Sequence, residues 1–291
     1  LNQKISIASA QLFGLKANLY QQTPQSKHNF QFVLDSLASK DTTKHTPLDL
    51  HIGSLIIRHG AVKYDKRYIA SKSGVFSPAH ISISDLSTHI IANHITDDDI
   101  NLHIKKLAFH DKSGLQLNSL SFKLDANKRE ASLKEFELQL PHSDITLGDI
   151  HATYRFDNGK LVMPSLQYSG SIEQSKITLS DIACLLPIFR HFEDAVFFET
   201  QFTGTSTSLR CQKINFKTGS GSINLQAKGR ISDWNSRPAW DVDIANLNLT
   251  EESISFISHN LGKKINVPKE VTRLGGIHYV GHLSGHCGRL S

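Results

Sequence analysis

The feature that most constrains this chain is a regular alternation of apolar and polar residues across residues 100–154. Four successive segments alternate in this way, as expected for β-strands with one buried face. Each segment also shifts its phase once, by a three-residue step between two apolar positions. The shifts lie between Ile104 and Leu107, Leu117 and Leu120, Leu133 and Phe136, and Leu147 and Ile150.

A three-residue step turns the next apolar side chain of a straight strand to the opposite face of the sheet. One extra residue at a β-bulge restores the face and bends the strand. Four such shifts at comparable positions therefore predict a sheet that curls along a line, with Leu, Ile and Phe on its inner side. Four ordinary strands of a β-sandwich with imperfect alternation explain the same residues, and this stretch alone does not choose between the two.

Strand-like segments separated by turns fill most of the remaining chain, with short helical signals between them. His59 and Gly60 suggest a tight hairpin, and the apolar spacing over residues 29–39 predicts an amphipathic helix before a polar linker. We expect an all-β fold with a few short helices, built from an elongated, strongly curled, mostly antiparallel sheet that forms an open apolar groove. The predicted segments are the N-terminal strands with helix and linker (1–47), a groove segment (48–179), and a continuing groove segment (180–291) with helical interruptions at about 180–192 and 251–261.

The charge distribution argues against a nucleic-acid partner. The chain has 32 Lys and Arg against 27 Asp and Glu, a net charge of +5, and the two signs are interspersed along it. A nucleic-acid binder usually concentrates its positive charge on one element with aromatic residues nearby. No apolar run approaches the ~18 residues that span a bilayer. Because the sequence begins at Leu1 and ends directly after a strand-like segment, we expect it to be an interior piece of a longer protein.

Neither the cysteines nor the histidines predict a metal site. The three cysteines are far apart in sequence, with no CxxC pair and no disulfide framework. His278, His282 and His286 are spaced four apart, but the many glycines around them favour a strand over a helix. Four residues of a strand span roughly 13 Å, which is too far for two of these side chains to share one zinc ion.

No local motif predicts catalysis or a cofactor. The chain lacks a GxSxG elbow, and residues 219–222 form a glycine-serine turn without the Gly-Lys-Ser/Thr and helix of a P-loop. Residues 97–99 are acidic but lack the alternating oxygen ligands and the turn glycine of a calcium loop. Asp241 and Asp243 belong to an alternating strand and are expected to face solvent. We therefore predict a protein that is not an enzyme and binds no cofactor.

Several strand runs resemble a known family. LDLHIGSLIIRHGAVKYD (48–65) followed by HISISDLSTHI (80–90) resembles the repeated units of AsmA-like proteins. The run from IKKLAFHD to HSDITL (104–147) is similar to the strand ladder of TamB-type proteins, which belong to the translocation and assembly module, in the form found in Bacteroidetes. Residues 177–189, 204–232 and 273–285 also fit this pattern, so the resemblance covers almost the whole chain.

The resemblance implies a periplasmic location, within a long protein anchored in the inner membrane. Proteins of this kind form a curled sheet, or β-taco, with an apolar lining. It also implies a conduit for phospholipid acyl chains between the inner and outer membranes, or a role in outer-membrane biogenesis with an Omp85-type partner such as a TamA-like or BamA-like protein. The partner would be contacted through parts of the protein outside this sequence.

The common phase of the apolar residues, after correction for the bulges, predicts which side chains line the lipid-binding groove. They are Ile104, Leu107, Leu117, Leu120, Phe122, Leu124, Leu133, Phe136, Leu138 and Leu147. Three other functions are compatible with the sequence. The first is a periplasmic chaperone or assembly factor that binds strands of outer-membrane β-barrel proteins. The second is a structural stalk with a filled interior, and the third is a hydrolase whose triad forms only in space.

Overall fold

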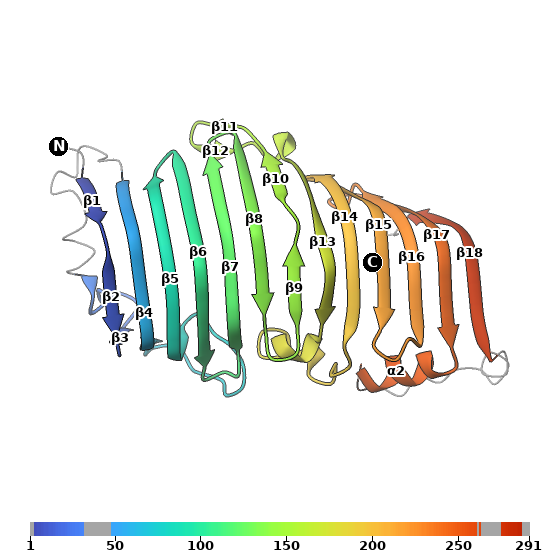
Figure 1. The fold of residues 1–291 in the computed structure, drawn as a ribbon, viewed down its shortest axis with the longest axis horizontal. Helices are drawn as coiled ribbons and strands as arrows, with labels where there is room; N and C mark the ends of the chain where they lie inside the picture. The colour runs from blue at the N-terminus through green and yellow to red at the C-terminus, as the bar shows by residue number, and fades with distance from the viewer. Residues whose placement is uncertain (1–2, 32–47, 261, 263–274, 287–291) are drawn as a thin grey trace. The chain divides into compact units, whose positions relative to one another are not determined.

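Strands make up most of the computed structural model, which describes residues 3–31, 48–260, 262 and 275–286 (Figure 1). The helix predicted over 29–39 and the linker after it lie almost entirely outside these residues. The chain divides into two compact units. Unit 1 comprises residues 1–127, 138–141 and 181–187, and unit 2 comprises 128–137, 142–180 and 188–291. The segments predicted as 1–47, 48–179 and 180–291 stay a prediction.

Unit 1 contains a four-stranded antiparallel meander. Its strands are β4 (Leu48–Lys66), β5 (His80–Thr96), β6 (Asp99–Asp111) and β7 (Gln116–Asn127), each paired with the next. Three short strands, β1 (Gln3–Ile7), β2 (Ala10–Phe13) and β3 (Lys16–Gln21), pair in succession with β4 and run parallel to it. The N-terminal strands expected from the sequence are therefore three short parallel partners of β4.

Unit 2 holds most of β8 (Glu130–Gln139) and a long series of antiparallel strands after it. Strand β9 (Asp144–Leu147) pairs with β13, and β10 (Ile150–Thr153) pairs with both β8 and β13. From β13 onward each strand pairs with the next in sequence. These strands are β13 (Gln167–Ile177), β14 (Val196–Thr205), β15 (Ser208–Thr218), β16 (Ile223–Ser232), β17 (Ala239–Thr250) and β18 (Gly276–His286).

Sixteen of the described strands belong to one mixed sheet, and β11 (Phe156–Asp157) and β12 (Lys160–Leu161) form a separate hairpin. The prediction of an all-β fold with a mostly antiparallel sheet is confirmed. The helical interruptions are also confirmed. Leu179–Ile182 and Pro187–Phe189 form 3-10 turns, and Glu252–Asn260 forms the helix α2. A further 3-10 turn covers Met163–Ser165.

The sequence predicts four bulges in the central stretch. The first two, on β6 and β7, are present as register shifts. Leu107 pairs with Leu120 and Phe109 pairs with Leu117, so the register shifts on both sides of Leu107. The third shift contains Glu135, whose φ of 52° is a left-handed backbone conformation inside β8. One class of β-bulge has a left-handed residue at its first position, and Glu135 has that conformation.

The fourth shift, between Leu147 and Ile150, is a strand break and not a bulge. Strand β9 ends at Leu147 and β10 begins at Ile150. Gly148 lies between them, and an added Cβ there would come within 2.0 Å of the Ser171 Oγ. Side chains of β13 therefore occupy the space beside Gly148, while the Gly148 backbone N–H still donates to the Ser171 carbonyl at 3.0 Å.

The hairpin predicted at His59 and Gly60 is wrong. Strand β4 continues through both residues for 19 residues, and its register with β5 shifts on either side of Gly60. A two-residue type I′ turn needs positive φ at two consecutive residues. Here only His59 has one, at 53°, so the chain forms a bulge and keeps its direction.

Apolar side chains are concentrated on sheet faces, and few of them are fully buried. Among the described residues, the nearly buried hydrophobic ones are Ala92, Ile104, Leu117, Cys184, Val196 and Ile244. The largest side chains with almost no exposure are polar: Asn260, Thr218, Ser143, Ser175 and Ser222. Most apolar side chains of the sheet therefore retain some contact with solvent.

Unit 2 fits large aromatic rings on its apolar face by placing glycines opposite them. Tyr168 of β13 pairs with Gly204 of β14, and an added Cβ on Gly204 would lie 2.4 Å from the Tyr168 ring. Trp240 of β17 pairs with Gly285 of β18 in the same manner, at 2.7 Å. Each ring covers the backbone of a glycine that no other residue could replace without displacing the ring.

We predict that Gly204→Ala destabilises the protein by about 1–3 kcal/mol, because the new methyl group overlaps the Tyr168 ring. In a Tyr168→Ala background the same substitution should cost less than half as much. A double-mutant cycle from urea unfolding measures this coupling. Equal costs in the two backgrounds would show that the ring does not require the glycine.

Candidate functional site

Six of the predicted groove residues lie on one face of unit 1. Ile104 pairs with Phe122, Leu107 with Leu120, and Leu102 with Leu124. Leu120, Phe122 and Leu124 alternate without interruption on β7, so their partners on β6 must share one face although Ile104 and Leu107 are three residues apart. Leu117 joins the same face through its partner Phe109. The bulge correction made from the sequence is therefore confirmed for β6 and β7.

The same face continues across β5 and β4. Ile90 of β5 lies opposite Ile104, and Leu55 of β4 lies opposite Ile90. With Phe122 these residues form an apolar row across four adjacent strands. Ile104 and Leu117 are nearly buried, whereas the other predicted groove residues of unit 1 keep partial exposure.

Unit 2 carries a comparable apolar face that contains Leu133 and Leu147. Leu133 pairs with Ile150, and Leu147 pairs with Ile172. Phe136 of β8 is half-buried, like Leu138, which follows it by two residues on the same strand and belongs to unit 1. All four of these predicted residues therefore lie in strands and keep partial exposure.

The apolar face of unit 2 extends well beyond the residues predicted from the sequence. From Ile172 the row runs through Thr200, Ile214, Ala227 and Ile244. A neighbouring row joins Phe198, Phe216, Leu225 and Leu247. The signal that could have found them is the same alternation, which is present in the sequence of β14 to β17.

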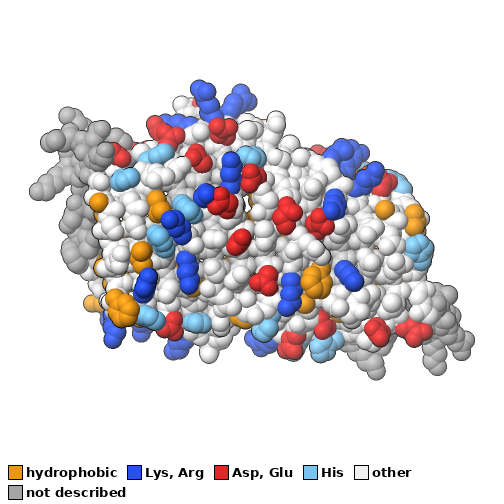
Figure 2. Space-filling view, viewed as in Figure 1, with side chains coloured by type: hydrophobic (Ala, Val, Ile, Leu, Met, Phe, Trp, Pro, Cys, Tyr) orange, Lys and Arg blue, Asp and Glu red, His pale blue; other side chains and the backbone are white. Residues whose placement is uncertain are grey.

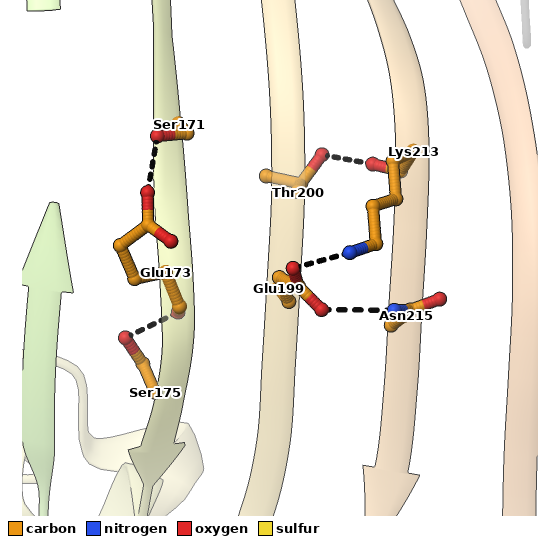
Figure 3. Close-up of polar contacts among 7 residues, drawn as sticks. All are labelled: Ser171, Glu173, Ser175, Glu199, Thr200, Lys213 and Asn215. Carbon is orange, nitrogen blue, oxygen red and sulfur yellow. Dashed lines mark hydrogen bonds and ion pairs between the residues drawn. The ribbon is translucent and has the colours of Figure 1, made fainter. Parts of the chain in front are cut away.

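The opposite face of unit 2 is polar, and its charges pair across strands. Figure 2 shows Lys, Arg, Asp and Glu side chains of both signs interspersed on one surface. In Figure 3, Glu199 of β14 accepts from Lys213, and from the Asn215 Nδ2 at 2.9 Å, both on β15. These two donors hold the pKa of the Glu199 carboxyl below its ordinary value. On the apolar face, the hydroxyl of Thr200 donates to the Lys213 carbonyl at 2.7 Å and joins the same two strands.

A second charge cluster joins the last two strands, β17 and β18. The His282 Nδ1 lies 2.7 Å from the Asp243 Oδ1, and its Nε2 lies 3.6 Å from the Asp241 Oδ2. The Lys228 Nζ lies 3.6 Å from the other Asp243 oxygen. The hydrogen bond with Asp243 raises the pKa of His282 and lowers the pKa of Asp243.

The structure confirms that His278, His282 and His286 lie on a strand. His278 pairs with Asn248 and His282 with Asp243, and the His278 Nδ1 lies 2.7 Å from the Asn248 Oδ1. These two rings therefore contact side chains of β17. Within the described residues, no group of three or more His, Cys, Asp or Glu side chains is arranged to hold a metal ion.

The pairing of β18 with β17 should depend on pH. Because the pKa of His282 is raised on folding, its stabilising effect is complete below the ordinary value of 6.5 and is lost as the pH rises through the raised value. Because the pKa of Asp243 is lowered, its effect is complete above 3.8 and is lost as the pH falls through the lowered value. Amide hydrogen exchange of β18, corrected for intrinsic rates, should therefore be slowest between about pH 4 and 6.5.

His282→Gln should remove the change in β18 exchange above pH 6.5, whereas His151→Gln, on a strand away from β18, should leave it intact. The same pH profile in His282→Gln and in the wild-type protein would contradict the assignment of this pH dependence to His282.

Within the described residues, no helix is both long enough and apolar enough to cross a membrane. Comparison of the chain with protein families, with curated proteins and with solved structures finds no match. Membership of the AsmA-like or TamB-type proteins, inferred from the strand patterns, therefore stays a prediction.

Proposed function

We propose that this chain is a non-enzymatic, lipid-conduit segment of a periplasmic protein of the AsmA-like or TamB type. Phospholipid acyl chains would move along its apolar face between the inner and outer membranes, within a protein anchored in the inner membrane. The observation that carries the proposal is the unbroken apolar row from Leu55 through Ile90 and Ile104 to Phe122. An Omp85-type partner, TamA-like or BamA-like, would act through parts of the protein outside this sequence.

The energetics of acyl chains suit such a face. Burying one CH₂ group contributes ~0.8 kcal/mol, so a chain of roughly 16 carbons gains on the order of 10 kcal/mol before its loss of conformational freedom is subtracted. The residues of the row offer no hydrogen-bonding group that would distinguish one acyl chain from another. The charged headgroup can stay in water, as it does when a lipid anchor binds an interface.

Partial exposure of the face also supports a ligand. In a packed core, side chains of this size are almost completely removed from water. Leu107, Leu120, Phe122 and Leu124 keep partial exposure although each lies in the interior of a paired strand. An apolar surface that its own chain does not cover completely is typical of an interaction site.

The edge strand β18 favours a second candidate function, a periplasmic chaperone for outer-membrane β-barrel proteins. Among the described residues, β18 ends the strand order of the sheet, and only β17 pairs with it. Ile277, Val280 and Leu283 on this strand are large, exposed hydrophobic residues. An exposed strand edge with apolar side chains can add a strand from another chain.

We predict that Leu120→Asp reduces co-purified phospholipid at least tenfold, because the new carboxylate would have to be desolvated beside the acyl chains. Ser121→Asp makes the same charge change on the opposite face of β7 and should keep the lipid. Native mass spectrometry of the purified protein measures bound lipid, and circular dichroism checks that both variants fold. Equal lipid content in the two variants would refute the acyl-chain face.

In-cell photo-crosslinking separates the two candidate functions. A photoreactive residue at Leu124 should give lipid adducts, and one at Val280 of β18 should not. Adducts with outer-membrane protein precursors at Val280, together with no lipid at Leu124, would favour the chaperone.

A further inference from the structure

Two arginines of unit 2 lie next to each other on its polar face, and one of them, Arg230, has Asp241 of β17 on its other side. Arg210 of β15 lies directly opposite Arg230 of β16. Like charges at directly opposed positions of an antiparallel pair destabilise the sheet. Within the described part of the chain, neither arginine has an ion pair or a side-chain hydrogen bond. Lys213 and Lys228 on the same strands do have carboxylate partners.

The two arginines complete a row of hydrogen-bond donors across five strands. His151 pairs with Ser169, Ser169 with Thr203, Thr203 with Arg210, and Arg210 with Arg230. All five residues line one hollow of about 690 Å³, and no carboxylate belongs to its lining. Side chains that are far apart in the sequence therefore converge on a single positively charged cavity.

The acidic residues nearest to this row lie on β17, where Asp241 is directly opposite Arg230. Both arginines also border a smaller hollow of about 290 Å³, whose lining includes Asp241 and Asp243. These carboxylates are already engaged by His282 and Lys228. A negatively charged ligand is therefore favoured in the larger hollow and disfavoured in the smaller one.

The chemistry of the larger hollow identifies the class of ligand. An arginine guanidinium binds two phosphate oxygens at once in a fixed geometry, and two adjacent arginines can share one phosphate group. The rest of the lining is rich in Ser and Thr hydroxyls, which hydrogen-bond equally well to the hydroxyls of a polyol. A volume of about 690 Å³ is within the range of small-molecule sites and exceeds what a lone phosphate ion would fill.

We propose that this hollow binds a phosphate group carried on a polyol such as glycerol, with Arg210 and Arg230 as its anchors. Arg210 lies between Leu209 and Cys211, which pair with Gly204 and Phe202 on the apolar face of β14, so the Arg210 side chain is on the opposite face of β15. The site is thus distinct from the acyl-chain face and does not depend on the lipid-conduit function. The phosphate could come from a free phosphorylated polyol or from a phospholipid headgroup.

Isothermal titration calorimetry with sn-glycerol 3-phosphate and with inorganic phosphate tests the site. The wild-type protein should bind glycerol 3-phosphate more tightly than phosphate. Arg210→Gln and Arg230→Gln should each weaken binding at least tenfold. Lys176→Gln makes the same charge change on β13 outside the hollow and should leave binding unchanged. An equal loss in Lys176→Gln would show non-specific attraction and overturn the proposal.

Flotation with phosphatidylglycerol vesicles distinguishes the two sources of phosphate. Vesicle binding that needs both arginines, without binding of the soluble ester, identifies a headgroup; the reverse pattern identifies a free metabolite. If wild-type protein binds neither vesicles nor either soluble probe, the site does not exist.

Arg210→Glu gives an independent readout, because it places opposite charges across β15 and β16. It should abolish binding of glycerol 3-phosphate and raise the midpoint of thermal unfolding of the ligand-free protein. A lower midpoint in a folded variant would show that the two arginines do not repel each other, and the argument for an anion between them would fail.

Discussion

The two-residue period of the β-strand is the constraint on which the structure depends. Side chains alternate between faces, so a single unmatched residue would move every later apolar side chain to the other side of the sheet. The register shifts around Leu107 absorb this mismatch on β6 and β7. Because of them, Ile104 and Leu107 stay on one face although their spacing is odd. The continuity of the apolar row, and any function assigned to it, follows from these shifts.

The two faces of the sheet differ in the kind of contact that holds neighbouring strands together. On the apolar face, contacts are non-directional, and glycines such as Gly204 make room for rings such as Tyr168. On the polar face of unit 2, contacts such as that of Glu199 with Lys213 are directional and join specific side chains across neighbouring strands. Arg210 and Arg230 lie opposite each other and have no ion pair within the described residues, whereas Lys213 and Lys228 on the same strands have carboxylate partners.

The sequence predicts what depends on local alternation and misses what depends on register. The strand class, the short helices and the common face of Leu107 and Leu120 follow from spacing along the chain. The parallel pairing of β1 to β3 does not, because short connections favour antiparallel neighbours. The sequence alone does not distinguish a bulge at His59, where the structure has one positive φ, from the two-residue turn of a hairpin. Arg210 and Arg230 are twenty positions apart, and only the pairing of β15 with β16 makes them neighbours.

Among the described residues, every strand from β13 to β18 pairs only with the strands before and after it in the chain, apart from the short β9 and β10 beside β13. Such a series of strands can gain or lose a whole hairpin without reversing the direction of any other strand. One face of the sheet then stays apolar and the other stays polar on both sides of the change. Loss of a single strand would instead reverse all that follow. The number of strands can therefore change in steps of two while the apolar and polar faces stay on their own sides of the sheet.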